Sequence, residues 1–464
     1  MTCRVLLVNP WITDFAAYNL WCYPLGLLSI GALLREEGCQ VDLLDCLDRR
    51  HPALQRLPRP PRNDLYGCGQ FLKTILPKPP AVAHIPRRYG RYGLPVEAVE
   101  AELDCHPRPD VILVTSGMTY WYPGVVDIIH RLQARWAGVP IVLGGTYATL
   151  CPDHARAHSG ADLVAPGVSE VDALRLVDQL TGRTSSYDKY TSPDSLPLPA
   201  HDLRSCQGYA ALHTSRGCPY HCPYCASAKL SPGGFLQRRP ERVVAEIRWC
   251  YEELGIRDFA FYDDALLVKA DEHLHPILEG ILIHGWACRF HTPNGLHAAL
   301  IDRGVAQRMF QAGFTVIRLG LETASTRGNG RAGAKVSEEG FRRGVAYLRE
   351  SGFHPSQIGA YILAGLPGQS TDEVREAIDL AHSLQVRALL AFYSPIPGTP
   401  TWQQAVDEGL IAPDADPLLH NDAVFPLLAE PQRRESFEKL KQYARRGNTT
   451  LCGPNPLCHS VPSA

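Results

Sequence analysis

Apolar residues along the chain gather in short runs separated by helical segments. The first series contains five such runs, at residues 4–8, 41–45, 111–114, 140–143 and 161–165. Short continuous apolar runs are typical of strands that are buried on both faces of a parallel sheet. The series therefore predicts an α/β fold that begins with a doubly wound, flavodoxin/Rossmann-like domain over residues 1–182. Such a domain binds its ligands at the carboxyl ends of the strands.

A second series comes after a polar linker at residues 183–204 and occupies residues 205–405. It contains six strand–helix units, with strands expected at residues 210–214, 258–262, 288–291, 315–320, 358–364 and 388–393. Six units of this kind predict a partial (β/α)6 TIM-type barrel, whose chemistry lies at the carboxyl ends of its strands.

Two segments do not follow the alternation. Residues 49–95 are rich in Pro and Arg, which favours a long insertion or arm over regular core structure. Residues 406–464 predict a short helical extension, with a basic helix at about 432–446 and an irregular tail. That tail contains Cys452 and Cys458, which are too few to hold a further cluster and are expected to be tail cysteines.

Composition narrows the classes of function. The net charge is −2, so the chain lacks the positive field that gathers nucleic-acid phosphates, and nucleic acid is not an expected partner. The apolar stretch at residues 24–34 is too short to span a bilayer, and the start lacks the features of a signal peptide. We therefore expect a cytoplasmic protein with reduced cysteines and no membrane partner. Fifteen cysteines in that compartment indicate metal or redox chemistry.

Three cysteines lie close together immediately after the first strand of the second series. Cys218, Cys222 and Cys225 stand in the sequence TSRGCPYHCPYCASAKL. A structural zinc site needs four ligands, whereas three thiolates on a four-iron cluster leave one iron open to another ligand. The alternatives are a zinc site completed by His213 or His221, or thiols without a metal.

This loop resembles that of the radical S-adenosylmethionine (SAM) superfamily, in which Cys-x3-Cys-x-aromatic-Cys follows the first barrel strand. The resemblance implies that Cys218, Cys222 and Cys225 hold a 4Fe-4S cluster and that SAM chelates the open iron. Reduction by an external donor, such as a flavodoxin or ferredoxin, then cleaves SAM to methionine and a 5′-deoxyadenosyl radical. Tyr224 is placed near the adenine.

Later strand ends carry the same resemblance in order. Asp263 and Asp264 end the second strand, where the family meets the SAM amino group, although the commoner Gly-Gly-Glu is absent. Glu322 lies in a segment similar to Gly-x-Glu-Ser, with Thr323 in place of Ser. Without the family context, paired Asp residues at a strand end are often only a helix N-cap. The SAM contacts that the resemblance implies are Tyr224, Asp263, Asp264, Glu322, Ser394 and Pro395.

The third strand end offers a possible substrate pocket at His291 and Asn294. A buried, hydrogen-bonded histidine with a purely structural role is the alternative for His291.

The first domain resembles that of the cobalamin-binding radical SAM subfamily. The residues that carry this comparison lie after strand ends, and they are Asn9, Pro10, Ser116, Gly144, Gly145 and Thr146. Glycines there allow the nucleotide tail of cobalamin to approach the backbone. The Asp-x-His-x-x-Gly motif, which supplies a cobalt ligand in many cobalamin proteins, is absent from residues 11–23. The alternative is a flavodoxin-like domain that only docks on the barrel.

Taken together, these resemblances imply a cobalamin-dependent methyltransferase that acts on an unactivated carbon of a small metabolite. A radical SAM rearrangement or oxidation without methyl transfer is the second hypothesis. A non-catalytic protein that binds cobalamin or an iron–sulfur cluster is the third. A tRNA methylthio-transfer enzyme is disfavoured by the near-neutral charge and the short tail.

Overall fold

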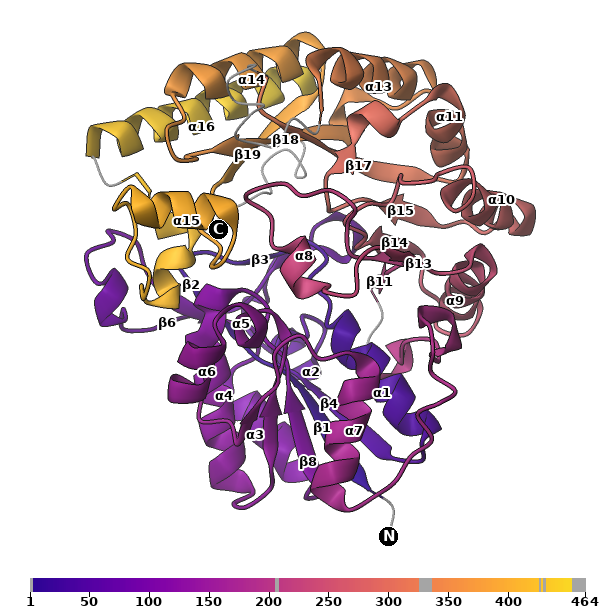
Figure 1. The fold of residues 1–464 in the computed structure, drawn as a ribbon, viewed down its shortest axis with the longest axis vertical. Coiled ribbons are helices and arrows are strands. Elements are labelled where there is room, and N and C mark those ends of the chain that lie inside the picture. Colours follow the sequence, from indigo (N-terminus) through magenta and orange to yellow (C-terminus); the bar gives the residue numbers. More distant parts are fainter. Residues whose placement is uncertain (1–2, 205–207, 325–335, 425–426, 429–430, 453–464) are drawn as a thin grey trace. The chain divides into compact units, whose positions relative to one another are not determined.

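The protein is represented by a computed structural model that describes residues 3–204, 208–324, 336–424, 427–428 and 431–452. The chain divides into two compact units (Figure 1). The first unit comprises Met1–Asn63, Gly69–Gln207 and Asp416–His420, and the second comprises Asp64–Cys68, Gly208–Ala415 and Asn421–Ala464. Within the described ranges, no helix is long and apolar enough to cross a membrane.

A five-stranded parallel sheet forms the centre of the first unit. Its strand order is β10-β9-β8-β1-β4, and the pairing is parallel throughout. The strands are β1 (Arg4–Asn9), β4 (Gln40–Asp45), β8 (Val111–Val114), β9 (Ile141–Leu143) and β10 (Leu163–Val164). Order and direction confirm the predicted doubly wound fold.

Both faces of this sheet are covered by helices. Leu6 and Val8 of β1 pack in one core with α3 (Val96–Cys105) and α4 (Tyr122–Arg135). The alternate residues of β1 pack in a second core with α1 (Leu25–Glu36) and α7 (Glu170–Thr181). Because successive side chains of a strand point to opposite faces, one apolar run serves both cores.

Residues 49–95 are more regular than the sequence predicts. They contain the short strands β5 (Gly69–Gln70), β6 (Lys73–Ile75) and β7 (Gly90–Tyr92). β7 pairs with β6 and with β2 (Ile12–Asp14), and β5 pairs with β3 (Tyr18–Asn19). Val82, Ile85 and Tyr89 are buried. The segment is therefore packed structure and not an irregular arm.

The second unit contains a parallel sheet in the order β11-β14-β15-β17-β18-β19, with β16 (Leu296–His297) beside β17. These six strands are β11 (Ala210–Leu212), β14 (Asp258–Phe261), β15 (Arg289–His291), β17 (Phe314–Glu322), β18 (Ile358–Ala364) and β19 (Arg387–Phe392). No pairing joins β11 to β19 in the described part of the chain. The structure confirms the predicted partial barrel, which stays open.

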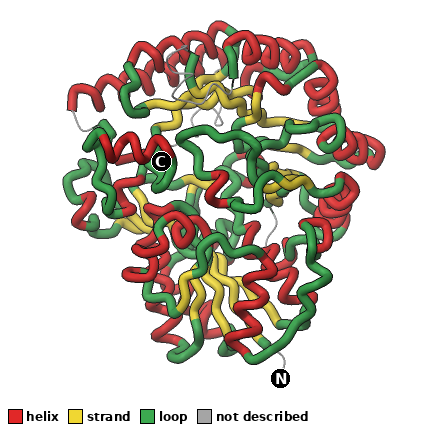
Figure 2. The backbone as a smooth tube through the Cα atoms, viewed as in Figure 1, coloured by secondary structure: helices red, strands yellow, loops and turns green. Residues whose placement is uncertain are grey.

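Helices cover the outer face of this open barrel (Figures 1 and 2). They are α9 (Pro240–Glu252), α10 (Leu274–His284), α11 (Arg303–Gln311), α13 (Glu338–Glu350) and α14 (Thr371–Ser383). α14 starts at a capping box, in which Ser370 and Glu373 each accept the other's backbone N–H.

The C-terminal helix α16 (Pro431–Cys452) is longer than predicted. Cys452 lies within this helix and not in an irregular tail, while Cys458 lies outside the described residues. Asn448 of α16 accepts the backbone N–H of Ala388 and donates to its carbonyl, both at 2.8 Å. These bonds satisfy backbone groups of β19, the last strand of the sheet.

Candidate active site

The three-cysteine segment is a loop with a closed base. β12 (Ser215–Arg216) pairs antiparallel with β13 (Leu236–Gln237), and residues 217–235, here called the cysteine loop, lie between them. Gly217 has φ +71°, and a Cβ at this position would lie 2.4 Å from the carbonyl oxygen of Gly234. The turn that leads into Cys218 therefore requires glycine, for both its conformation and its lack of a side chain.

The thiols of the cysteine loop interact electrostatically. Cys218 and Cys222 are half-buried and Cys225 is exposed. Desolvation by the surrounding protein raises the pKa of the Cys225 thiol, the backbone N–H of Ser227 opposes this shift, and negative charge on Asp264 raises the pKa further. Of the described residues, no three His, Cys, Asp or Glu side chains converge tightly enough to hold one metal ion. The thiols of a cluster each bind a different iron, so this all-thiol donor set fits a 4Fe-4S cluster better than a single ion.

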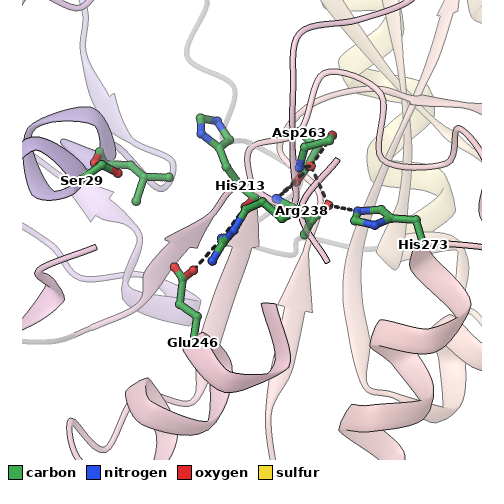
Figure 3. A network of polar contacts seen from close by, with 9 residues as sticks. Ser29, His213, Arg238, Glu246, Asp263 and His273 are labelled. Atoms are coloured by element: carbon green, nitrogen blue, oxygen red, sulfur yellow. Dashed lines mark hydrogen bonds and ion pairs between the residues drawn. The ribbon is translucent and has the colours of Figure 1, made fainter. Parts of the chain in front are cut away.

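A buried carboxylate, that of Asp263, takes part in a network of hydrogen bonds at the base of the cysteine loop; Figure 3 shows this network. Asp263 follows β14, and its Oδ1 accepts hydrogen bonds from the hydroxyls of Thr214 and Ser215 at 2.7 and 2.6 Å. The backbone N–H groups of the same two residues also donate to it. Asp264 is exposed instead, and its Oδ2 accepts from Ser227 Oγ at 2.6 Å. The SAM contact of Asp263 stays a prediction, and its carboxylate already has other partners.

Glu322 ends β17 in a strained conformation. Its φ is +61°, in the left-handed region that non-glycine residues rarely adopt, and the pairing register shifts between Gly320 and Glu322. A Cβ on Gly320 would lie 2.7 Å from Glu322 Oε1, so glycine there leaves room for the carboxylate. Burial, followed by the charge of Glu322, raises the pKa of Tyr224. The structure thus brings two predicted SAM contacts together.

The segment after β19 reaches the cysteine loop. Ser394 is half-buried and Pro395 is buried directly after the strand. A few residues on, the backbone N–H of Thr401 donates to the carbonyl of Pro223 at 3.0 Å. The chain just beyond the predicted SAM contacts Ser394 and Pro395 is therefore hydrogen-bonded to the loop that carries the cysteines.

His291 and Asn294 are both engaged within the protein. His291 is fully buried, and its Nε2 lies 3.0 Å from Asp258 Oδ1. Arg289 forms a two-point ion pair with the same carboxylate. Burial lowers the pKa of His291, although Asp258 opposes the shift. Asn294 donates to the carbonyl of Tyr262 at 2.7 Å. These contacts match the structural alternative for His291, and a substrate contact for either residue stays a prediction.

In the first unit, four of the predicted cobalamin contacts converge. Ser116 Oγ donates to the carbonyl of Gly144 at 2.6 Å, and Thr146 N donates to the carbonyl of Ser116 at 2.8 Å. Gly145 has φ +86°, and a Cβ there would lie 2.5 Å from Ser116 O. At Gly144 an added Cβ would meet only Ala165 O, at 3.9 Å. The protein itself thus gives no steric reason for glycine at Gly144, and this edge fits the approach of a bulky cofactor.

The remaining two predicted contacts lie at the end of β1 and just after it. Asn9 donates through Nδ2 to Asp45 Oδ1 at 2.7 Å, and Arg204 lies 3.4 Å from the other oxygen of that carboxylate. Pro10 is buried. The side chain of Asn9 therefore joins the ends of β1 and β4, and its role toward cobalamin stays a prediction.

Sequence reasoning missed several residues around these sites. Thr214, Ser215 and His273 build the base of the cysteine loop, with His273 Nε2 lying 2.9 Å from Thr214 Oγ1. Tyr66, although it belongs to the segment 49–95, lies in the second unit with its ring 4.7 Å from that of His291. A strand end followed by Thr and Ser was a weak signal for the first group. No feature of the sequence around Tyr66 indicates that it lies beside His291.

Comparison with known families agrees with this geometry. The profile of the radical SAM superfamily matches residues 212–381, and that of the B12 binding domain matches residues 89–175. The chain contains a radical SAM domain and a B12 binding domain. The two matches confirm the predicted cofactors of this radical SAM enzyme, namely a 4Fe-4S cluster, SAM and cobalamin.

Relatives of this radical SAM enzyme include named methyltransferases. It is 27% identical to an uncharacterized methyltransferase of Pyrococcus horikoshii, over 65% of this chain and 71% of the relative. It is 22% identical to the cytidylyl-2-hydroxyethylphosphonate methyltransferase of Streptomyces wedmorensis, over 89% of this chain and 83% of the relative. The fold is similar to that of the radical SAM methyltransferase TsrM from Kitasatospora setae, with TM-score 0.65, 17% identity, and 88% and 78% of the two chains covered.

Proposed function

We propose that this enzyme is a cobalamin-dependent methyltransferase that methylates an unactivated carbon of a small molecule. The observation that carries the proposal is the presence, in one chain, of the three-thiol cysteine loop and a B12 binding domain with open space at Gly144. The names of the relatives support it. When bound, the cluster and cobalamin supply the reductive cleavage of SAM and the carriage of a methyl group.

The residues of the chain bind and orient these groups. Cys218, Cys222 and Cys225 hold the cluster, and Glu322 accepts a hydrogen bond from the SAM ribose or amino group. The remaining predicted SAM contacts lie in the cysteine loop or just after strand ends, and they are Tyr224, Asp264, Ser394 and Pro395. Electrons come from a small external donor of the flavodoxin or ferredoxin class.

The proposal is tested by the two products that SAM yields. The protein is reconstituted anaerobically with iron and sulfide, with or without hydroxocobalamin, and is then given SAM and a low-potential reductant. We expect 5′-deoxyadenosine in both samples and S-adenosylhomocysteine only in the sample that contains cobalamin. 5′-Deoxyadenosine without any S-adenosylhomocysteine would favour a rearrangement or oxidation enzyme. Neither product would contradict both enzyme hypotheses.

A pair of cysteine variants controls this experiment. Cys222→Ala should abolish 5′-deoxyadenosine, because a cluster ligand is lost. Cys105→Ala removes an exposed thiol of the first unit and should leave the yield unchanged. Persistence of 5′-deoxyadenosine in Cys222→Ala would contradict the assignment of the cluster ligands.

A further inference from the structure

We propose that Asp263 is a positioning residue that fixes the base of the cysteine loop ahead of the first cysteine, whereas its neighbour Asp264 contacts the loop at Ser227, after the last cysteine. This inference deepens the proposed function, because it rests on the cluster assignment, but it does not depend on methyl transfer. It also differs from the sequence prediction, which treats both carboxylates as SAM contacts.

The hydrogen bonds to the carboxylate of Asp263 come from two adjacent residues, Thr214 and Ser215. The side chain is 4% exposed, and Oδ1 accepts from the backbone N–H and the hydroxyl of both Thr214 and Ser215, at 2.5 to 3.0 Å. Oδ2 accepts a second contact from Thr214 N at 3.2 Å. Thr214 and Ser215 are the residues through which β11 passes into Gly217 and Cys218. The carboxylate therefore holds the chain just before the first cysteine.

Burial makes this arrangement strong and specific. A carboxylate taken out of water is costly unless hydrogen bonds satisfy it, and bonds to a charged acceptor are about twice as strong as neutral ones. The bonds from Thr214 and Ser215 satisfy Asp263 in this way. Removing the charge would leave several donors competing for a weaker acceptor.

Thr214 is also held by a hydrogen bond to a histidine that precedes α10. His273, which precedes α10 and is 2% exposed, lies with Nε2 2.9 Å from Thr214 Oγ1. On the other side of the base, Arg238 donates to the carbonyl of His213 and to Glu246, both at 2.7 Å (Figure 3). Thr214 is thus held between Asp263 and His273, while Arg238 fixes the returning strand of the loop.

The matched pair Asp263→Asn and Asp264→Asn tests the proposal on the reconstituted full chain. Two quantities are measured: the rate at which EDTA removes iron, and the Kd of SAM for the fraction that keeps its cluster. Asp263→Asn should lose iron about tenfold faster than the wild type, because hydrogen bonds to a charged group are weakened. Its SAM affinity should change less than twofold. Asp264→Asn weakens a single hydrogen bond, from Ser227 after the last cysteine, and should lose iron at most about twofold faster than the wild type.

General destabilisation is separated from positioning by a control in the same unit. Asp302 caps α11 by accepting the N–H of Val305 at 2.8 Å, so Asp302→Ala destabilises the unit without touching the cysteine loop. It should lower the melting temperature but leave iron loss unchanged. The EPR spectrum of the reduced cluster should change in Asp263→Asn and stay that of the wild type in Asp302→Ala.

Thr214→Val keeps the carboxylate and removes only the hydroxyl between Asp263 and His273. It should lose iron about threefold faster than the wild type, and it decides the question if Asp263→Asn does not fold. The proposal is overturned if Asp263→Asn keeps its iron like the wild type but binds SAM at least tenfold more weakly. It is also overturned if Thr214→Val and Asp302→Ala lose iron equally fast. Failure to form S-adenosylhomocysteine would leave these results untouched.

Discussion

The carboxyl edges of the two sheets present different chemistry. In the second unit, ionisable side chains lie at or just after the strand ends, and Asp263 among them is held by hydrogen bonds from Thr214 and Ser215. In the first unit, the edge at Ser116 and Gly144 consists of backbone and small side chains. The two edges belong to the same class of sheet and differ in the residues that come directly after each strand.

The difference matches the ligand that the proposed function assigns to each edge. An iron–sulfur cluster and the charged end of SAM need thiolates and carboxylates at defined places, so their site is made of reactive side chains. A large cofactor held along its nucleotide tail needs space and backbone groups, which glycine supplies. A Gly→Ala substitution adds one methyl group. At the edge of the second unit it should therefore impair cluster assembly or SAM binding, and at the edge of the first unit it should impair folding or cobalamin binding.

The largest effect is expected for Gly217→Ala at the base of the cysteine loop. The left-handed backbone and the contact with Gly234 O at 2.4 Å should together lower stability by about 3 kcal/mol and prevent cluster assembly. Thermal unfolding measures the loss of stability, and the iron content measures cluster assembly. Gly233→Ala is the control, since a Cβ there meets nothing within 4 Å. Equal iron content in the two variants would contradict the steric argument.

At the carboxyl edge of the first sheet, substitution of one glycine should impair folding, and substitution of its neighbour should impair only cobalamin binding. Gly145→Ala places a Cβ 2.5 Å from Ser116 O and should lower stability by about 2 kcal/mol. Gly144→Ala should leave the melting temperature unchanged and weaken hydroxocobalamin binding about tenfold, measured by equilibrium dialysis. Unchanged cobalamin affinity in Gly144→Ala would remove the main structural argument for the cofactor at this edge.

A subtler change at the second edge is Gly320→Ala. The added Cβ would lie 2.7 Å from Glu322 Oε1 and displace that carboxylate, while the cysteine loop is untouched. We expect a SAM Kd about tenfold higher with normal iron content, because one charged contact is misplaced. If Glu322 does not contact SAM, the Kd should stay at the wild-type value.

The smallest effect concerns the pH dependence of the first unit. Burial lowers the pKa of His420 to about 3, and its Nδ1 lies 3.0 Å from Thr119 Oγ1. Between pH 6.5 and 3, the unfolded chain binds a proton that the folded imidazole does not, so stability falls as the pH falls. His420→Asn should reduce that loss by about 1 kcal/mol between pH 6 and pH 5. Chemical unfolding of the apo-protein at both pH values measures the difference.

The sequence predicted the parts of the site in which reactive residues stand next to a strand end. Cys218 and Glu322 are recognisable because the chemistry and the strand share a few consecutive residues. The hydrogen bonds that join Thr214 to Asp263 and His273 were not predicted, because these residues are far apart in the sequence and only the fold brings them together.

The strands within residues 49–95 were missed for another reason. Each has two or three residues, which is too short to show alternation, and Pro is frequent in the segment. The left-handed φ of Glu322 also has no sequence signal, and it coincides with a register shift in the pairing of β17 with β18.

Neither unit is a continuous stretch of chain, and this has a consequence for biosynthesis. Residues 64–68 belong to the second unit, and residues 416–420, which include His420, belong to the first. During translation, Thr119 therefore receives its histidine partner only after most of the barrel has been synthesised. A fragment that ends at residue 207 would lack this contact, so the B12 binding domain completes its folding late and should be produced as part of the whole chain.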